Sequence, residues 1–522
     1  MKNLNFFVLA AIVLLAFVLR IYNVSVLPPS LSWDEVSIGY NAYSILKTGH
    51  DEHGLFMPLD AFAAYGDYKP PLPVYLTVPF IAIFGLTELS VRLPSVIAGA
   101  LTVLVLFFFV QELLKSDRIG FISSALLAIS PWHIQLSRAG FEANIALLFV
   151  LLGSYFLLKK WFLIGWIPYV AAMYTFNSAR YVVPVLAVIF MFYLKKSLLR
   201  NVKSVSIGIL FAFILLLPLV PHLVSKEARL RFGEVNIFTD ASVVQTANER
   251  IEADGNTFWA KIMHNRRVGF ARSYLLHFFD NFEPKFLFIR GDGNPKFSLQ
   301  DVGELYAIEL PLLILGFKWH FRDYRAIAWL HLALLIASIA PAATARETPH
   351  ALRIENALPA FLIAISYAIS QITRKRAVAA IIVMLYIANF SFFWHNYMNH
   401  YALEFSGEWQ YGYKQAIEKV QPLKSNYEKI VLSENIGRPY MYVSFYERLD
   451  PRLMRGSIKG SFDAAGFYNV TALGLYQFVR SVEIFEKNTL YILSPREVPP
   501  GARVLDTVRL LNGSPVLVIF DV

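Results

Sequence analysis

Long apolar segments recur along most of this 522-residue chain, and they constrain its fold more than any other feature. A helix needs about 20 mostly apolar residues to cross a lipid bilayer. Hydrophobic residues make up 56% of the sequence, at a mean hydropathy of +0.48. This composition is typical of a polytopic α-helical membrane protein rather than a soluble enzyme. We therefore predict about eleven transmembrane helices, over roughly residues 5–25, 92–114, 118–136, 142–158, 161–177, 181–195, 204–223, 304–318, 325–342, 354–372 and 377–395.

Clusters of lysine and arginine between these segments predict the orientation of the chain, because cytoplasmic loops carry an excess of cations. Five clusters occupy alternate loops, at Lys115/Arg118, Lys159/Lys160, Lys195/Lys196/Arg200/Lys203, Lys318/Arg322/Arg325 and Arg374/Lys375/Arg376. The short apolar segment 72–85 determines on which side of the membrane these clusters lie. If it were a transmembrane span, all five clusters would lie outside the cytoplasm. We interpret 72–85 as a juxtamembrane or re-entrant helix, which places the clusters in the cytoplasm with Lys2.

This orientation leaves three long stretches on the outer face of the membrane. They are a first loop over about 26–91, a larger loop over about 224–303, and a tail over 397–522. We treat 1–396 as a membrane-embedded catalytic domain and the tail as an extracytoplasmic α/β domain. The tail's pattern predicts a helix at 407–419, and Asn512-Gly513 is typical of a hairpin turn. The strands expected in the tail cover 429–432, 440–446, 490–493, 504–511 and 516–520.

Several kinds of site are disfavoured by composition. The sequence contains no cysteine, so neither a disulfide framework nor a thiolate metal site can form. The formal net charge of +10 resides mostly in the cytoplasmic clusters, so we predict no nucleic-acid partner. We find no glycine-rich phosphate loop and no metal-binding motif. No cofactor is therefore implied, although a divalent metal held by carboxylates from separate loops stays open.

The first outer loop carries the groups that a sugar-transfer reaction needs. Asp34 and Glu35 follow the first apolar segment, and Lys69 precedes two prolines. A carboxylate can take a proton from an acceptor hydroxyl, and a cation can stabilise a departing phosphate. Asp34 also suits the N-cap of a helix from Glu35 to Leu46. The pattern predicts a membrane-bound glycosyl transfer reaction with Asp34 as the general base.

Four sequence elements resemble the GT-C-type glycosyltransferases of the protein O-mannosyltransferase and aminoarabinose-transferase group. Together they cover about the first 150 residues, in the order in which the family has them. The last of them ends in Glu142, where the family usually has aspartate. The elements are Trp33-Asp34-Glu35, Tyr68-Lys69-Pro70-Pro71, Val91-Arg92-Leu-Pro94-Ser95, and Ser130-Pro-Trp-His133-Ile-Gln-Leu-Ser137-Arg138-Ala-Gly-Phe141-Glu142.

The resemblance implies a GT-C fold and an inverting glycosyltransferase of the plasma membrane, with its active site outside the cytoplasm. The implied donor is a polyprenyl-phosphate sugar within the membrane lipid, and the implied acceptor is a hydroxyl of a protein, glycan or lipid. Asp34 and Glu35 are the expected catalytic residues. The expected donor-phosphate ligands are Lys69, Arg92, Arg138, Arg180 and Arg353. The expected supporting residues are Asp67, Glu142, Tyr40, His350 and Asn177.

Two other functions stay open at this point. A polyprenyl-linked oligosaccharide transferase would favour a metal-binding acidic cluster and a Trp-Trp-Asp-type acceptor motif, and neither is present. A non-enzymatic transporter of lipids or solutes would favour internal repeats and charges at mid-membrane depth. The predicted topology instead collects the charged candidates on one side of the membrane.

Overall fold

The computed structural model describes residues 2–225, 228–229, 233, 235–463 and 467–522. They form two compact units. The first comprises residues 1–16, 101–134 and 146–390, and the second comprises 17–100, 135–145 and 391–522. Five helices contribute residues to both units: α1 (Lys2–Ile21), α4 (Glu88–Leu114), α6 (Pro131–Arg138), α7 (Glu142–Leu158) and α20 (Arg376–Asn399).

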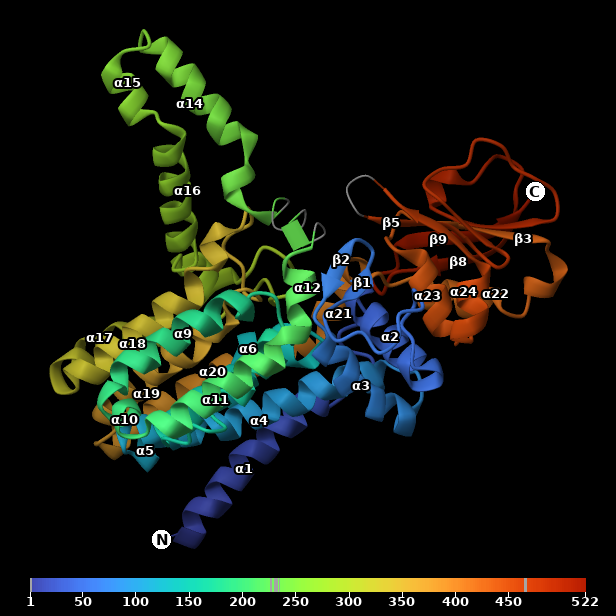
Figure 1. Cartoon of the computed structure of the whole chain (residues 1–522). Coiled ribbons are helices and arrows are strands. Elements are labelled where there is room, and N and C mark those ends of the chain that lie inside the picture. The colour runs from blue at the N-terminus through green and yellow to red at the C-terminus, as the bar shows by residue number, and fades with distance from the viewer. Residues whose placement is uncertain (1, 226–227, 230–232, 234, 464–466) are drawn as a thin grey trace. The chain divides into compact units, whose positions relative to one another are not determined.

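The regular elements among the described residues of the first unit are helices and short helical turns (Figure 1). Apolar helices pack side by side in it, with α17 against α19 and α19 against α5. Its further α-helices are α5 (Asp117–Ile129), α8 (Ile167–Met173), α9 (Ala179–Tyr193), α10 (Lys195–Arg200), α11 (Val202–Leu216), α12 (Val220–Leu223), α14 (Ala241–Ala253), α15 (Phe258–Met263), α16 (Arg266–Asp280), α17 (Glu309–Asp323), α18 (Arg325–Ile339) and α19 (Leu358–Ile372). Short turns of other helix types are η1 (Leu217–Leu219), η2 (Ile237–Thr239), η3 (Phe286–Arg290), η4 (Ala342–Thr344) and η5 (Glu355–Ala357).

Each of the eleven predicted spans contains a helix, but the helices differ in length. Among the described residues, five are long and apolar enough to cross a membrane, which supports a polytopic membrane protein. They are Leu4–Ile21, Glu88–Leu114, Val202–Leu223, Arg325–Thr344 and Arg376–Asn399. The predicted span 118–136 is broken, since α5 and α6 meet at a bend of 55°. Pro131 begins α6, and proline has no N–H to continue the helix before it.

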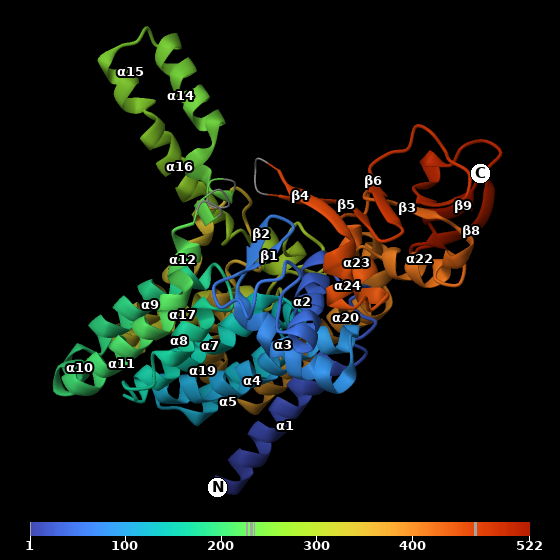
Figure 2. The same ribbon diagram turned by 45° about the vertical axis from the view of Figure 1, so that its right-hand side comes forward.

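The large loop predicted at about 224–303 contains a helical hairpin that its sequence pattern did not suggest. Helices α14 and α16 lie against each other, and α15 forms the turn between them (Figure 2). The Cβ that Gly269 lacks would lie 2.9 Å from the Val243 side chain, so a small residue is needed at this contact. Part of the segment that precedes α14 lies outside the described residues.

The second unit combines the first loop with the tail. Its helices are α2 (Trp33–Thr48), α3 (Pro71–Phe84), α21 (Tyr401–Phe405), α22 (Tyr413–Val420), α23 (Pro439–Tyr446) and α24 (Pro451–Ser457), with short turns η6 (Ser406–Trp409), η7 (Lys424–Asn426) and η8 (Pro495–Glu497). The segment interpreted as a short helix at 72–85 is α3. The Cβ that Gly39 of α2 lacks would lie 2.6 Å from Val91 and 2.8 Å from Phe445 of α23. The first loop and the tail therefore share one hydrophobic core.

The tail contains a seven-stranded mixed sheet in the order β4-β5-β6-β3-β7-β9-β8. Strand β3 is parallel to β6 and β7, and β8 and β9 form the predicted hairpin. Alternate residues of β3 face opposite sides: Ile430 and Leu432 belong to the core shared with the helices, and Val431 to a second cluster. The strands are β3 (Lys429–Ser433), β4 (Ile458–Phe462), β5 (Tyr468–Leu473), β6 (Tyr476–Val479), β7 (Thr489–Leu493), β8 (Arg503–Arg509) and β9 (Pro515–Asp521).

One predicted strand of the tail is wrong. Residues 440–446 form helix α23 instead of a strand, and every residue from Pro439 to Phe445 is buried. A short apolar run that is buried on all sides does not show whether it is a helix or a strand. Pro439 at the first helical turn was the available signal, since proline favours that position. The division of the chain at residue 396 stays a prediction.

Candidate functional site

A two-residue hairpin places two charged side chains of the first loop together. Strands β1 (Phe62–Ala64) and β2 (Asp67–Lys69) are joined by Tyr65 and Gly66, which both have positive φ. Such a turn matches the natural twist of an antiparallel pair. Asp67 and Lys69 are two residues apart in β2, so their side chains lie on the same face of the strand. The Nζ of Lys69 lies 2.9 Å from a carboxylate oxygen of Asp67.

Helix α2 presents Asp34 while other residues cap it. The expected N-cap role of Asp34 is wrong, because Ser32 is the N-cap and Glu35 completes the capping box. Glu35 accepts from the backbone N–H of Ser32 at 2.8 Å. Asp34 lies one residue before Glu35, and its carboxylate points to Lys69, with 2.9 Å between Oδ1 and Nζ. The capping box therefore leaves the Asp34 carboxylate available for chemistry.

Three carboxylates surround the ammonium group of Lys69. The third is Glu142 at the start of α7, 3.9 Å from Nζ. The side chain of Asp34 is 30% exposed, whereas that of Lys69 is 11% exposed. Burial by itself lowers the pKa of the Lys69 ammonium, but the surrounding carboxylates outweigh it and hold that pKa well above its ordinary value. We call Asp34, Asp67, Lys69 and Glu142 the Lys69 cluster.

Glu35 and Arg92 form a fully buried ion pair behind this cluster. Arg92 Nε donates to Glu35 Oε1 at 2.8 Å, and the same oxygen accepts from the backbone N–H of Gly140 at 3.0 Å. The remaining donors of Arg92 bind three backbone carbonyls, those of Val24, Pro28 and Ser30. Both side chains are completely buried. These contacts support a structural role for the pair, which fixes the chain that leads into α2.

Arg138 and Tyr40 are likewise buried and hold backbone segments. Arg138 donates to the carbonyls of Leu19, Arg20 and Leu27, at distances between 2.7 and 3.3 Å. Its guanidinium also lies 5.2 Å from the ring centre of Tyr397. The hydroxyl of Tyr40 donates to the carbonyl of Leu449 at 3.0 Å. Arg138 and Tyr40 are as fully buried as Glu35 and Arg92.

The remaining predicted residues lie in the first unit. Arg180 donates from Nε to the carbonyl of Met173 at 3.2 Å, and its buried Nη2 has no hydrogen-bond partner among the described residues. The buried Oδ1 of Asn177 also has no hydrogen-bond partner there. Ser178 links this segment to Arg353 through the Arg353 carbonyl, at 3.5 Å. Arg180 therefore retains donor capacity that a phosphate oxygen could use.

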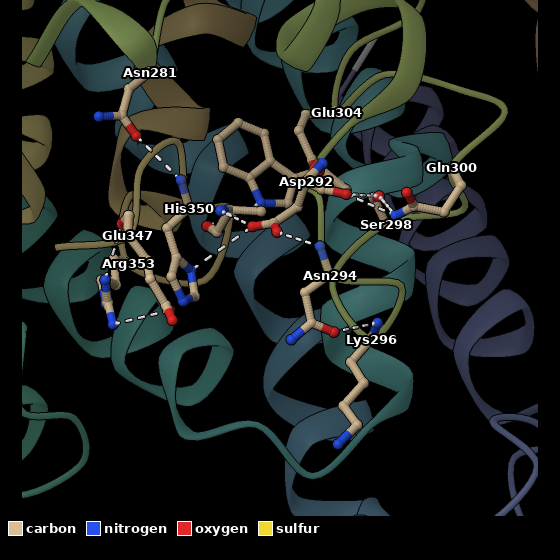
Figure 3. Close-up of polar contacts among 12 residues, drawn as sticks. Asn281, Asp292, Asn294, Lys296, Ser298, Gln300, Glu304, Glu347, His350 and Arg353 are labelled. Carbon is tan, nitrogen blue, oxygen red and sulfur yellow. Dashed lines mark hydrogen bonds and ion pairs between the residues drawn. The ribbon is translucent and has the colours of Figure 1, made fainter. Parts of the chain in front are cut away.

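Asp292 lies at the centre of a second polar cluster in the first unit (Figure 3). Its carboxylate accepts from the backbone N–H groups of Asn294 at 2.8 Å and of Ala351 at 2.7 Å. His350 Nδ1 lies 3.8 Å from the same carboxylate, and Glu304 accepts from the Asp292 backbone at 2.9 Å. Burial raises the pKa of the Asp292 carboxyl to about 6. Burial, together with the nearby charge of Arg353, lowers the pKa of the His350 imidazole to about 3.

Sequence reasoning found His350 and Arg353 but missed Asp292 and Glu304. The available signal was the run Gly291-Asp-Gly-Asn-Pro295, whose residues favour turns. Turn chemistry explains such a run without any functional role, and Asp292 does accept backbone N–H groups in the way that turn aspartates do. Its proximity to His350 depends on two segments about 60 residues apart in the sequence.

No group of three or more histidine, aspartate or glutamate side chains in the described residues is arranged to hold a metal ion. The described carboxylates of the Lys69 cluster instead converge on an ammonium group.

Comparison with known proteins identifies the type of enzyme. The family model for dolichyl-phosphate-mannose-protein mannosyltransferases matches residues 10–228, which include the whole Lys69 cluster. This match confirms the resemblance predicted from the sequence. The chain is a glycosyltransferase. A search of curated protein sequences finds no match.

Solved structures show that the fold is of the GT-C kind. A crystal structure of ArnT from Cupriavidus metallidurans bound to undecaprenyl phosphate is similar at a TM-score of 0.54 and 13% identity, over 99% of this chain and 97% of that one. The oligosaccharyltransferase of Archaeoglobus fulgidus tethered to an acceptor peptide gives a TM-score of 0.53 at 13% identity. That match covers 86% of this glycosyltransferase and 63% of the archaeal chain.

Proposed function

We propose that this glycosyltransferase moves a sugar from a polyprenyl-phosphate donor to an acceptor hydroxyl at the outer face of the plasma membrane. The observation that carries the proposal is the Lys69 cluster, which lies within the match to a family that uses dolichyl-phosphate-mannose. The similar ArnT structure holds undecaprenyl phosphate, another polyprenyl phosphate. The positive-inside bias of the cytoplasmic loops supports the outer location of the site. The C-terminal α/β region belongs to the same outer side in this proposal.

Asp34 is the proposed general base. Its carboxylate takes the proton of the acceptor hydroxyl as that oxygen forms a bond to the anomeric carbon. The bond between the anomeric carbon and the phosphate oxygen breaks, and its electron pair leaves with the phosphate. Configuration inverts in this single displacement, and no covalent enzyme intermediate is formed. Exposure supports this assignment, because Asp34 is the most exposed carboxylate of the cluster.

Lys69 is the proposed partner of the leaving phosphate. Three carboxylates keep the Lys69 side chain protonated. A positively charged group in a fixed position stabilises the negative charge that develops on the phosphate in the transition state. Asp67 and Glu142 position Lys69 between them. The role of Arg180 and Arg353 at a donor phosphate stays a prediction from the sequence, and the unpartnered Nη2 of Arg180 leaves that side chain with donor capacity. We assign Glu35, Arg92, Arg138 and Tyr40 to the support of the backbone around the cluster.

Transfer from radiolabelled polyprenyl-phosphate sugars in membranes that contain wild type or Asp34→Asn tests the proposal. We expect label to enter a protein, glycan or lipid fraction with wild type only, and the new bond to have the anomeric configuration opposite to that of the donor. Asp60→Asn is the matched control, since Asp60 is a partly buried carboxylate of the same loop outside the Lys69 cluster. Equal transfer by Asp34→Asn and wild type would remove Asp34 as the base. A retained configuration would exclude a single displacement.

The two other functions are not favoured by the comparisons. The match to a monophosphate-sugar family favours the simple donor over a lipid-linked oligosaccharide. A transporter without enzymatic activity would not explain a match to a mannosyltransferase family model.

A further inference from the structure

The hairpin of α14, α15 and α16 exposes an unusual amount of apolar surface. In α15, the side chains of Phe258, Trp259 and Met263 are 72%, 67% and 62% exposed. In α16, Val268, Leu275 and Phe279 are 50%, 53% and 63% exposed. Contiguous exposed apolar surface on a protein marks a place where something else binds.

The exposed residues of α16 lie on one side of the helix. Val268, Leu275 and Phe279 follow at intervals of seven and four residues, which returns to the same face of an α-helix. A different side of α16 contacts α14, where Gly269 meets Val243. At least half of the surface of each residue in this stripe is therefore left exposed.

Charge is divided between the two sides of the hairpin. From Phe258 to Phe279 the chain has no acidic residue and four cations, at Lys261, Arg266, Arg267 and Arg272. All four cations are exposed. Three acidic residues of the hairpin, Glu249, Glu252 and Asp254, lie in α14 and the turn after it, and a fourth, Asp280, ends α16. A basic, aromatic, amphipathic pair of helices is what an anionic lipid surface attracts.

Both ribbon views show the hairpin projecting sideways from the helices of the first unit. It does not continue the direction of α17, α18 and α9 (Figures 1 and 2). A helix that crosses a bilayer and a helix that lies in its interface run in different directions. The hairpin and the apolar helices of the first unit differ in this way. Trp259 and the cations nearby are residue types that favour the boundary between lipid tails and headgroups.

We propose that the α15–α16 side of this hairpin is a membrane-surface anchor for anionic phospholipid. Phe258, Trp259, Ile262 and Met263 insert among the acyl chains at the lipid boundary. Lys261, Arg266 and Arg267 contact the headgroup phosphates above them. The acidic α14 faces water. This surface is separate from the Lys69 cluster, and its assignment does not depend on the proposed transfer reaction.

The absence of cysteine from the sequence makes the proposal directly testable. A single cysteine introduced by Met263→Cys in the full-length protein carries an environment-sensitive fluorophore. The matched control is Thr246→Cys, an exposed position on α14. Each labelled protein is reconstituted into vesicles of phosphatidylcholine with phosphatidylglycerol, and quenching is measured with aqueous iodide and with a lipid-attached quencher.

We expect the probe at 263 to be quenched mainly by the lipid-attached quencher and the probe at 246 mainly by iodide. The triple variant Lys261→Gln/Arg266→Gln/Arg267→Gln, made in the Met263→Cys protein, should reduce the lipid quenching at 263. In vesicles of phosphatidylcholine alone, the lipid quenching at 263 should also be reduced in the Met263→Cys protein that keeps Lys261, Arg266 and Arg267. Equal iodide quenching at 263 and 246 in the mixed vesicles would overturn the proposal. If the probe at 263 is protected from iodide only after a soluble protein fraction is added, the proposal would be overturned in favour of a protein partner.

Discussion

The Lys69 cluster and the buried arginines Arg92 and Arg138 use the same kind of charge for different purposes. Lys69 forms ion pairs with three carboxylates, and one of them, Asp34, is 30% exposed. Arg92 and Arg138 are fully buried and direct most of their donors to backbone carbonyls. A carboxylate that faces solvent can give up its ion pair and bind a substrate instead. Backbone carbonyls of a folded loop stay in place, so an arginine that binds them is not free to bind a substrate.

This difference separates residues that the sequence grouped together. All three cations were expected to bind the donor phosphate, because each lies in a sequence element that resembles the family. Breaking a buried ion pair leaves an unpaired charge in the protein and costs about 3–5 kcal/mol. Removing a partly exposed catalytic carboxylate has little effect on stability but removes a reaction step. Stability and activity measurements therefore distinguish the two groups.

The largest expected effect is on activity in Asp34→Asn. Loss of a general base lowers the rate of transfer by roughly 100-fold to 10,000-fold. The melting temperature of the purified protein should stay close to that of wild type, since Ser32 and Glu35 still cap α2. Initial rates with a polyprenyl-phosphate sugar, alongside thermal unfolding in detergent, check both parts. A large drop in melting temperature would place Asp34 with the structural residues.

Arg92→Met should have the opposite profile. We expect the free energy of unfolding to fall by about 3–5 kcal/mol, because Glu35 and three carbonyls lose their buried partner. Thermal or denaturant unfolding of the purified variant measures this. Lys419→Met is the control, since it removes a half-exposed ion pair with Asp506 that should contribute about 1 kcal/mol or less. A fully stable Arg92→Met that fails only in donor binding would return Arg92 to the donor site.

Lys69→Gln should reduce activity by about 100-fold, mainly through kcat, because the cation acts on charge that develops in the transition state. Without the ammonium, repulsion among the three carboxylates favours protonation, so the acidic limb of the pH–rate profile should move to higher pH. Rate profiles across pH for wild type and variant test this. An unchanged profile with a raised KM alone would make Lys69 a simple binding residue.

Asp292 gives the smallest expected effect, on the pH dependence of stability. The pKa of its carboxyl is about 6 in the folded protein, above the ordinary value, so the folded state binds the proton more tightly than the unfolded state. The contribution is therefore greatest in acid and is lost as the pH rises through about 6. His350 acts in the opposite sense, because a lowered pKa makes acid destabilising. The test therefore compares the pH profile of stability of wild type with that of the Asp292→Asn variant. The His350 contribution cancels in this difference where the pKa of His350 is the same in both proteins.

The difference in melting temperature, wild type minus Asp292→Asn, should decrease between about pH 4 and pH 6. Asparagine keeps one accepting oxygen but replaces the other with an NH2 donor, so the variant also loses one of the two backbone hydrogen bonds. That loss does not depend on pH, so the change of the difference with pH reports the titration of Asp292. A difference that is constant across this range would show that Asp292 does not titrate there.

Much of the candidate site could be predicted from local sequence. Asp34, Lys69 and Glu142 belong to short elements whose order along the chain matches a family, and the hairpin turn at Tyr65-Gly66 brings Asp67 beside Lys69 by the geometry of a strand. The convergence of Asp34 and Glu142 on the same ammonium could not be derived locally. It requires α2, β2 and the start of α7 to pack together, and contacts between distant segments leave no periodic signal in any one of them.

The sequence by itself determined that this protein is a polytopic helical membrane protein with a glycosyltransferase signature, because apolar spans and short motifs are local patterns. Tertiary structure decided which charges are available for chemistry. Asp34 and Glu35 are neighbours in the sequence, yet one reaches the partly exposed Lys69 and the other is enclosed with Arg92. Burial and partner choice depend on what packs against each side chain, and that information resides in the fold rather than in the adjacent residues.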